Sequence, residues 1–288
     1  MNLYNHNIRD FSHTASLDSE KNEIYLVEKK IILNDAYQET YNFCNNQGRT
    51  IVLYKNIDSF VLNIENVLSF ECFIKTHEVF YQLHQDGNKN LLEYWFSHTL
   101  LPIFFTISNK YYFLHAGSVR VANTTVLFMA DSMGGKSTMT DYFLQQGHKL
   151  VSDDKVGTYL DDGRIMLVSS YPYHRPYRKF EDLGIKVVNF ESNVTHLDII
   201  YALDVNPMYD EVIIEELKGV EKVSFLIRGT DIGLPLFLKE RFAYVTKLAN
   251  ITPVYKIHIP KDITRLHEAY TAITKQMKIM GDKNEFRK

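Results

Sequence analysis

The chain has 288 residues, a formal net charge of −3 and 45% hydrophobic residues. This length allows one large domain or two modest ones, and the composition is typical of a globular protein. The small negative charge provides no overall attraction to nucleic acid or to anionic membranes, so neither is an expected partner.

The compartment can be predicted from the cysteines and the apolar segments. Cys44 and Cys72 lack the spacing of a metal site, which favours a reduced, cytoplasmic compartment. Residues 1–21 lack the apolar core of a signal peptide, and the longest apolar run, residues 100–107, is far too short to span a bilayer. We therefore expect a cytoplasmic protein without a membrane segment.

The first part of the chain predicts a β-rich region. Short runs with strand-like alternation occupy residues 23–33, 50–55, 59–65 and 67–75, and polar turn residues separate them. The clearest loop is 84–90, where Asp86 and Gly87 form a turn signal. We interpret residues 1–88 as an N-terminal β-rich region that could recognise a substrate or partner, and residues 89–288 as a catalytic domain.

The second region begins with a predicted helix and then alternates strands and helices. Apolar residues recur at helical spacing over 90–105, where Pro102 is expected to kink or end the helix. A strand with a turn at Gly117 and then a buried strand are predicted at 110–121 and 124–130. A helix is predicted next at 136–146, with Gly147 as its C-terminal cap. Two further strands are predicted at 148–160 and 164–170.

The remaining part of the chain is less regular. Strands are predicted at 198–205, 222–229 and 254–260, and one or two helices at 233–251. The final predicted helix covers 261–281, with Asp262 as its N-cap and an apolar stripe that we assign to core packing.

Residues 127–138 contain a pattern that is typical of a phosphate-binding loop. Gly135, Lys136 and Ser137 match the end of G-x-x-x-x-G-K-[ST], whereas Ala130 replaces the first glycine. In such loops backbone N–H groups and the positive end of the next helix bind phosphate, while the lysine and hydroxyl contact phosphates and Mg²⁺. A methyl group is tolerated where φ is negative, so the sequence predicts a variant nucleotide site.

Two adjacent carboxylates follow in the run "GHKLVSDD". If the strand ends at Asp153 and Asp154, both could approach a bound phosphate, one holding Mg²⁺ and the other accepting a proton from an attacking hydroxyl. His115 ends the strand before the loop strand and could lie beside Asp153, where it would help to set the proton affinity of that carboxylate. The alternative interpretation of the pair is a solvated turn.

Together, "LHAGSVRV", "VLFMADSMGGKST" and "GHKLVSDDKV" resemble the catalytic core of the HPr kinase/phosphorylase family. The sequence is more similar still to HPr-kinase-like serine kinases outside sugar-transport regulation, including those that modify peptide natural products. The resemblance is firm over residues 112–158 and looser over 89–270. It implies an α/β fold of α+β mixed-sheet type, with a P-loop core like that of phosphoenolpyruvate carboxykinase.

This resemblance implies a Mg²⁺-dependent transfer of phosphate from ATP to a hydroxyl, and it assigns roles to matching residues. Asp153 is expected to be the catalytic base with His115 beside it, while Asp154 and Ser137 hold Mg²⁺. The loop residues expected to bind the nucleotide are Ser132, Met133, Gly134, Gly135, Lys136, Ser137 and Thr138, of which Lys136 also acts in catalysis. Arg175 and Arg178 are nearby basic candidates for phosphate or acceptor contacts.

One departure from the family concerns the acceptor. In "EDLGIKVVNF", residues 181–190, Glu181 stands where HPr kinases proper carry an arginine, which argues against HPr as substrate and against phosphorylase activity. The expected acceptor is a serine of a peptide or protein; the alternatives are the hydroxyl of an amino acid or sugar, or a nucleotide-binding regulatory module without turnover. Family members are often oligomers, so the chain could form a homo-oligomer.

Overall fold

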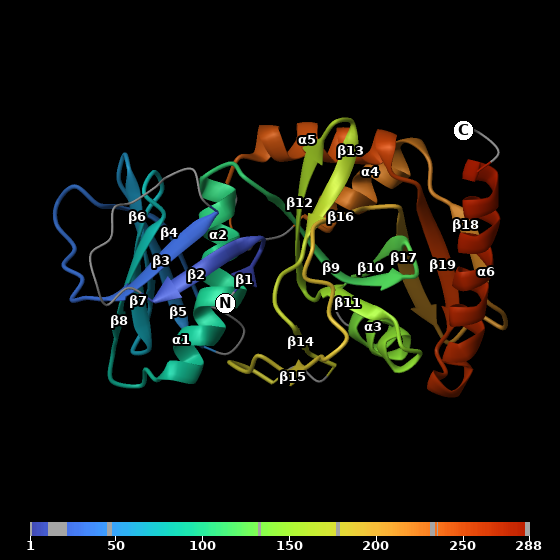
Figure 1. The fold of residues 1–288 in the computed structure, drawn as a ribbon, viewed down its shortest axis with the longest axis horizontal. Helices are drawn as coiled ribbons and strands as arrows, with labels where there is room; N and C mark the ends of the chain where they lie inside the picture. Colours follow the sequence, from blue (N-terminus) through green and yellow to red (C-terminus); the bar gives the residue numbers. More distant parts are fainter. Residues whose placement is uncertain are drawn as a thin grey trace. The chain divides into compact units, whose positions relative to one another are not determined.

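The computed structural model describes residues 2–10, 22–44, 48–131, 134–176, 179–230, 234 and 236–285. The protein has a mixed α/β fold with mixed sheets and few helices, and it divides into two compact units (Figure 1). The first unit comprises Met1–Tyr111, Arg178–Gly184 and Ile232–Leu236. The second comprises Tyr112–Tyr177, Ile185–Asp231 and Phe237–Lys288.

The first unit is built on a sheet, which confirms the β-rich character predicted for this region. Among the described residues its strand order is β1-β2-β3-β8-β7-β6-β5-β4. Strands β2, β3 and β8 pair in parallel, whereas the other neighbours are antiparallel. The strands are β1 (Asn2–Leu3), β2 (His6–Asp10), β3 (Glu23–Glu28), β4 (Gln38–Cys44), β5 (Thr50–Lys55), β6 (Ser59–Ile64), β7 (Leu68–Phe73) and β8 (Glu78–Leu83).

A helical segment completes the first unit, and the predicted boundary at residue 88 therefore falls inside this unit. It consists of α1 (Lys89–Trp95), the π-helix η1 (Phe96–Leu100) and α2 (Leu101–Ile107). Phe96 packs against Phe70 of the sheet, and Phe104 packs against Phe60. The π-helix ends two residues before Pro102, which lacks an N–H group, so the predicted disturbance of the helix takes the form of a wider turn.

The second unit contains a larger sheet with the strand order β16-β13-β12-β9-β10-β17-β19-β18, and β11 also pairs with β9. A separate two-stranded sheet is formed by β14 and β15. The strands are β9 (Tyr112–Val121), β10 (Thr124–Met129), β11 (Lys149–Ser152), β12 (Lys155–Asp161), β13 (Arg164–Val168), β14 (Tyr173–His174), β15 (Ile185–Lys186), β16 (Thr195–His196), β17 (Ile199–Asn206), β18 (Ile213–Glu216) and β19 (Val254–Pro260).

Helices cover both faces of this sheet (Figure 1). Helices α3 (Lys136–Gln145) and α6 (Leu266–Glu285), with the 3₁₀ turn η2 (Ile263–Arg265), pack on one face; α4 (Gly219–Arg228) and α5 (Leu238–Ile251) pack on the other. Strand β10 contributes Leu127 and Met129 to one core and Val126 and Phe128 to the other. Burial on both faces explains why this strand is continuously apolar in the sequence.

Strand direction fixes which ends of the strands meet. Strands β10, β17 and β19 pair in parallel, so their carboxyl ends lie at one edge of the sheet. Strand β9 is antiparallel both to β10 and to the chain formed by β11 and β12. Strands β10 and β11 therefore run in the same direction on opposite sides of β9, and their carboxyl ends meet at the same edge.

Two sequence expectations in the second unit are wrong. Strand β9 runs through Gly117, which pairs with Phe128, so there is no turn at this glycine. Residues 222–229 form most of helix α4, not a strand. A short apolar run does not by itself distinguish a strand from a buried helix, and in this case the buried Leu226 faces the core between neighbours that are partly exposed.

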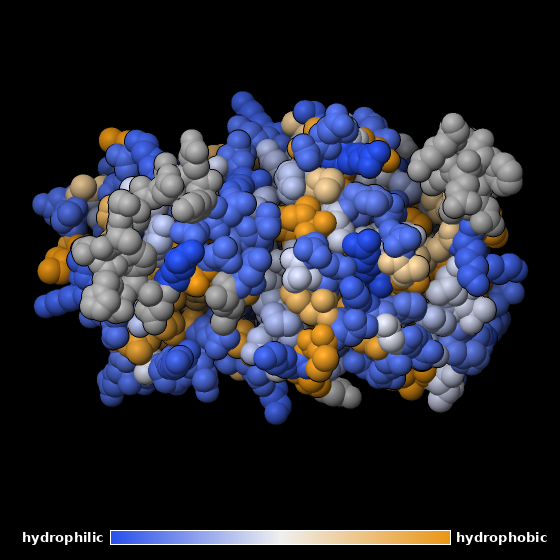
Figure 2. Space-filling model, viewed as in Figure 1, coloured by the Kyte–Doolittle hydropathy of each residue, from blue (hydrophilic) through white to orange (hydrophobic). Residues whose placement is uncertain are grey.

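The surface is mostly polar on the face shown in Figure 2, with small, scattered groups of hydrophobic residues. The most exposed large hydrophobic side chains of the described residues include Val188, Ile57 and Met208. Within the described part of the chain, no helix combines the length and apolar character needed to cross a membrane.

Gly117 is a point of close contact between helix α3 and the sheet. A Cβ atom at this position would lie 2.1 Å from Thr140 Oγ1. The Thr140 side chain is fully buried, and its hydroxyl has no hydrogen-bond partner among the described residues. Glycine in a strand commonly marks such a close approach between elements.

We predict that Gly117→Ala destabilises the protein by about 1–3 kcal/mol, because the added methyl forces α3 away from β9. Thr140→Ala should be nearly neutral, since it removes a buried hydroxyl that lacks a partner. The double variant should recover most of the lost stability in urea unfolding. If the two changes were simply additive, the proposed contact between helix and strand would be incorrect.

A buried histidine in the first unit is paired with a lysine. His6 donates from Nδ1 to the Tyr4 carbonyl at 2.7 Å, and its Nε2 accepts from Lys110 Nζ at 2.9 Å. Lys110 also donates to Asn22 Oδ1 at 3.0 Å. Burial lowers the pKa of His6 to about 4, and the positive charge of Lys110 acts in the same direction. His6 is therefore neutral in the folded protein at pH 7.

We predict that His6 makes the stability of the protein depend on pH between about 6.5 and 4. In this window the unfolded chain binds a proton at His6 that the folded protein does not bind, so stability falls as pH falls and levels off below about 4. The loss amounts to at most about 3 kcal/mol. Unfolding free energies of wild type and His6→Asn, measured between pH 7 and pH 4, should differ in slope; parallel curves would contradict the prediction.

Candidate active site

The predicted phosphate loop lies between a strand and a helix, as its chemistry requires. Strand β10 ends at Met129 and helix α3 begins at Lys136. Gly135 is the N-cap of α3 and has a φ of 87°, a left-handed conformation that favours glycine. Two of the expected nucleotide-binding residues, Ser132 and Met133, lie outside the described residues.

Ala130 replaces the first glycine of the motif, and Gly134 leaves room for its methyl group. Ala130 is not among the described residues with positive φ, so its methyl group imposes no backbone strain. A Cβ atom at Gly134 would lie only 2.7 Å from the Ala130 Cβ and 2.9 Å from the Asp131 carbonyl oxygen. The space that a side chain at 134 would need is therefore already occupied by the alanine.

Lys136 brings a positive charge to the loop. Its side chain is buried, and its Nζ donates to the carbonyl oxygens of Ala130 at 2.9 Å and Asp131 at 3.3 Å. Ser137 and Thr138 follow in the first turn of α3, where the free backbone N–H groups and the positive end of the helix lie. A polyphosphate fits this combination of an ammonium group, helix end and hydroxyls.

The two aspartates directly follow the end of β11 at Ser152, as expected, and lie in an irregular step before β12 begins at Lys155. Ser152 of β11 pairs with Ser118, and Lys155 of β12 pairs with His115, so Asp153 and Asp154 interrupt the ladder. Asp154 has a φ of 67°, which is uncommon for a residue other than glycine. Irregularities of this kind redirect side chains and are frequent near active sites.

Asp153 is the more buried of the two carboxylates, with 6% of its side chain exposed. Its Oδ1 accepts from the Asp154 backbone N–H at 3.0 Å. Its Oδ2 accepts from the Arg175 backbone N–H at 2.9 Å and from His174 Nδ1 at 3.0 Å. Three donors therefore hold this carboxylate in place.

Asp154 is more accessible, with 19% of its side chain exposed. Its Oδ1 lies 3.1 Å from His115 Nδ1, which also contacts the Asp154 carbonyl oxygen at 3.1 Å. His115 is therefore the partner of Asp154, not of Asp153 as expected, because the irregular backbone turns Asp154 towards the β9 residue. The Arg175 guanidinium lies 3.9 Å from Asp154 Oδ2, while Arg178 is outside the described residues.

His174 is a residue of this site that sequence reasoning missed. It is 2% exposed and connects two elements: Nδ1 contacts Asp153, and Nε2 lies 3.6 Å from Asp141 Oδ1 on helix α3. The "YPYHRPYRKF" segment contains no motif that singles out this histidine. His174 lies in β14, and its neighbours Asp153 and Asp141 come from two other segments of the chain, so the local sequence does not reveal its position.

The loop and the acidic pair lie at the same edge of the sheet. Ala116 of β9 pairs with Met129 at the end of β10, and on its other side its N–H donates to the Asp154 carbonyl at 3.2 Å. The two sites are thus separated by two strand spacings, roughly 10 Å. A nucleotide with its phosphates in the loop could present its terminal phosphate to Asp154, His115 and Arg175.

The residues present are compatible with Mg²⁺ held largely by a nucleotide. Among the described residues there is no group of three or more His, Cys, Asp or Glu side chains that could hold a metal ion. Mg²⁺ at phosphate-transfer sites is usually bound by substrate phosphates, water and one or two protein oxygens. Ser137 in the first turn of α3 and one carboxylate of the acidic pair meet this requirement.

Comparisons with known proteins give a limited result. No protein-family model matches the chain, and no curated protein matches it either. Among solved structures, the chain is similar to the HPr(Ser) kinase/phosphatase from Coxiella burnetii, with 15% sequence identity and a TM-score of 0.34. The similarity covers 61% of this chain and 96% of that chain.

We predict that His174 stabilises the protein mainly through Asp153. His174→Ala should cost about 1.5–3 kcal/mol, because a buried carboxylate loses a donor. His174→Asn can keep a donor near the Nδ1 position and should cost less, whereas His174→Gln directs its amide towards Asp141 and should resemble the alanine variant. Urea unfolding measures these differences.

The matched control for this prediction is His196→Ala. His196 lies 2.9 Å from Asp198, but it is an exposed histidine, and surface ion pairs contribute about 0–1 kcal/mol. An equal loss for the variants at 174 and 196 would mean that the buried pair has no special role.

Proposed function

We propose that the protein is a Mg²⁺-ATP-dependent phosphotransferase that transfers the γ-phosphoryl group to a hydroxyl, with a serine of a peptide or protein as the favoured acceptor. The observation that carries the proposal is the position of Lys136 and the α3 N-terminus at the same sheet edge as Asp154, His115 and Arg175. Charge neutralisation and correct positioning provide most of the catalysis in phosphoryl transfer.

The exposures of Asp153 and Asp154 favour a different assignment of the catalytic base from the one that the sequence suggested. Asp153 already accepts three hydrogen bonds and has little access to an acceptor. Asp154 is more accessible and has a histidine partner that can orient it. We therefore assign the base to Asp154, and we assign to Asp153 the task of holding the irregular segment and the Arg175 backbone.

The transfer follows from these positions. Asp154 takes the proton of the acceptor hydroxyl as the oxygen attacks the γ-phosphorus, and the bond to the bridging oxygen of ADP breaks. Lys136 and the α3 N–H groups bind the polyphosphate, and the Arg175 guanidinium can contact the transferring group. Mg²⁺, when bound with Ser137 as a ligand, would neutralise charge on the β- and γ-phosphates.

The acceptor is assigned by resemblance and by chemistry. A peptide or protein serine is favoured by the likeness of the motifs to HPr-kinase-like serine kinases. The hydroxyl of an amino acid or sugar requires the same base and the same nucleotide site, so it remains the alternative substrate class. A regulatory module would use the loop alone and would not need Asp154 with its histidine partner.

We predict distinct defects for three variants when transfer of labelled γ-phosphate from Mg²⁺-ATP to peptides, amino acids and sugars is measured. Lys136→Ala should weaken ATP binding at least about tenfold, because it removes a charged donor. Asp154→Asn should lower transfer by about 10²–10⁴-fold with ATP binding nearly unchanged. Asp153→Asn should lower stability more than it lowers transfer.

The control is Asp161→Asn, which changes an exposed aspartate at the end of β12 and should leave transfer and binding unchanged. Loss of transfer in Asp153→Asn together with full transfer in Asp154→Asn would return the base to Asp153. Binding of ATP without transfer to any acceptor would favour the regulatory module, and absence of ATP binding would contradict the proposal as a whole.

A further inference from the structure

We propose that an apolar pocket beside the phosphate loop binds the base of the nucleotide. This inference rests on the proposed function, since it assigns the second half of the ligand whose phosphates lie at the α3 N-terminus. The pocket lies at the carboxyl ends of β17 and β19, outside the motif that predicted the nucleotide site.

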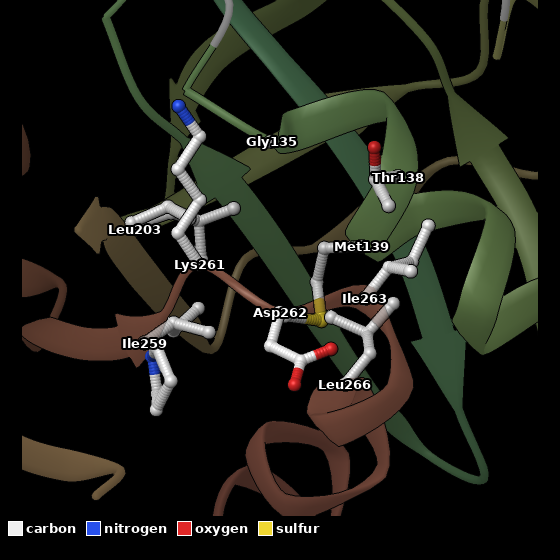
Figure 3. A pocket seen from close by; sticks show the side chains of 11 residues that line it. Gly135, Thr138, Met139, Leu203, Ile259, Lys261, Asp262, Ile263 and Leu266 are labelled. Atoms are coloured by element: carbon white, nitrogen blue, oxygen red, sulfur yellow. The ribbon is translucent and has the colours of Figure 1, made fainter. Parts of the chain in front are cut away.

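The pocket has a volume of about 360 Å³, within the range of small-molecule sites. Its walls come from the start of α3, from the ends of β17 and β19, and from the segment leading into α6. The lining includes Gly135, Met139, Val205, Asp262, Ile263 and Leu266. Figure 3 shows Met139, Ile263 and Leu266 close together between α3 and the start of α6.

The pocket directly adjoins the loop. Gly135 belongs both to the pocket wall and to the loop, where it is the N-cap of α3. A Cβ atom at Gly135 would lie 3.3 Å from Val205 Cγ2, so the turn of the loop packs against the end of β17. A ligand whose phosphates occupy the loop therefore needs only a short connection to reach the pocket.

The order of the strands indicates which end of a bound nucleotide would lie towards the acidic pair. Strand β10, which carries the loop, lies between β9 on one side and β17 on the other. The acidic pair lies beyond β9, whereas the pocket lies at the ends of β17 and β19. With the phosphate chain in the loop, the terminal phosphate points towards Asp154 and the opposite end of the nucleotide points towards the pocket. The acceptor must approach from the side of the acidic pair, so the pocket is left for the base.

The chemistry of the walls suits a flat, neutral, largely apolar group. Most lining side chains are aliphatic, and contact with them removes the faces of a base from water. Asp262 contributes a carboxylate whose Oδ1 accepts from the Thr264 hydroxyl at 2.7 Å and from its backbone N–H at 2.9 Å. Lys261 brings the opposite charge to the same wall, so the lining has no net charge that would favour a phosphate over a neutral base.

The test compares two Mg²⁺-bound ligands, ATP and ribose 5-triphosphate, which lacks the base, by calorimetry on the full chain. Wild type should bind ATP at least about tenfold more tightly than ribose 5-triphosphate, because only ATP buries a base. Ile263→Trp and Leu266→Trp fill the pocket from the segment that leads into α6, away from the phosphate loop. Each should weaken ATP binding by about tenfold and leave ribose 5-triphosphate binding nearly unchanged.

Thr271→Trp is the matched control, because Thr271 is an exposed threonine of α6 that does not line the pocket. It should bind both ligands as wild type does. Equal affinity of wild type for ATP and ribose 5-triphosphate would overturn the pocket assignment and leave the phosphate loop intact; this comparison needs no variant. If wild type bound neither ligand, the proposed function would fail, and the base pocket with it.

Discussion

The close contact between helix α3 and strand β9 at Gly117 is the constraint on which the candidate site depends. Because position 117 has no side chain, Thr140 can pack directly on the strand, and the first turn of α3 is held over the carboxyl end of β10. The same helix carries Asp141, which faces His174 and through it Asp153. The packing of α3 on β9 thus holds the helix end beside the loop and also places Asp141 3.6 Å from His174, the residue that contacts Asp153.

Sequence reasoning located the parts of the site that are encoded locally. The strand, the loop and the helix of residues 124–145 follow each other without a break, so the glycines, Lys136 and Ser137 could be identified from their spacing alone. The tolerance of Ala130 could also be predicted, because it depends on the sign of one φ angle. Gly134 also helps to accommodate Ala130, because it has no side chain that would collide with the alanine methyl group. This could not be predicted, because the sequence does not give the distance between two residues across a turn.

The pairing of histidines with aspartates could not be obtained in the same way. Neighbouring strand ends suggested that His115 would meet Asp153, but the segment between β11 and β12 contains Asp154 in a left-handed conformation, with its carboxylate beside His115. His115 therefore contacts Asp154. The histidine beside Asp153 is His174, which lies in the hairpin formed by β14 and β15. Long-range pairing and the left-handed conformation of Asp154 leave no periodic signal. The misassigned helix α4 differs, because Val220, Val223 and Leu226 do recur at helical spacing.

Glu181 shows how a departure from a family pattern can acquire a structural explanation. Its carboxylate accepts from Trp95 Nε1 at 3.0 Å and from the Arg49 guanidinium at 3.2 Å. All three residues belong to the first compact unit, although residues 178–184 are inserted between two stretches of the second unit in the chain. An arginine at this position would face Arg49 and would lose the hydrogen bond from the indole. The glutamate therefore has a structural role in the first unit, and its presence does not by itself argue against the proposed phosphoryl transfer.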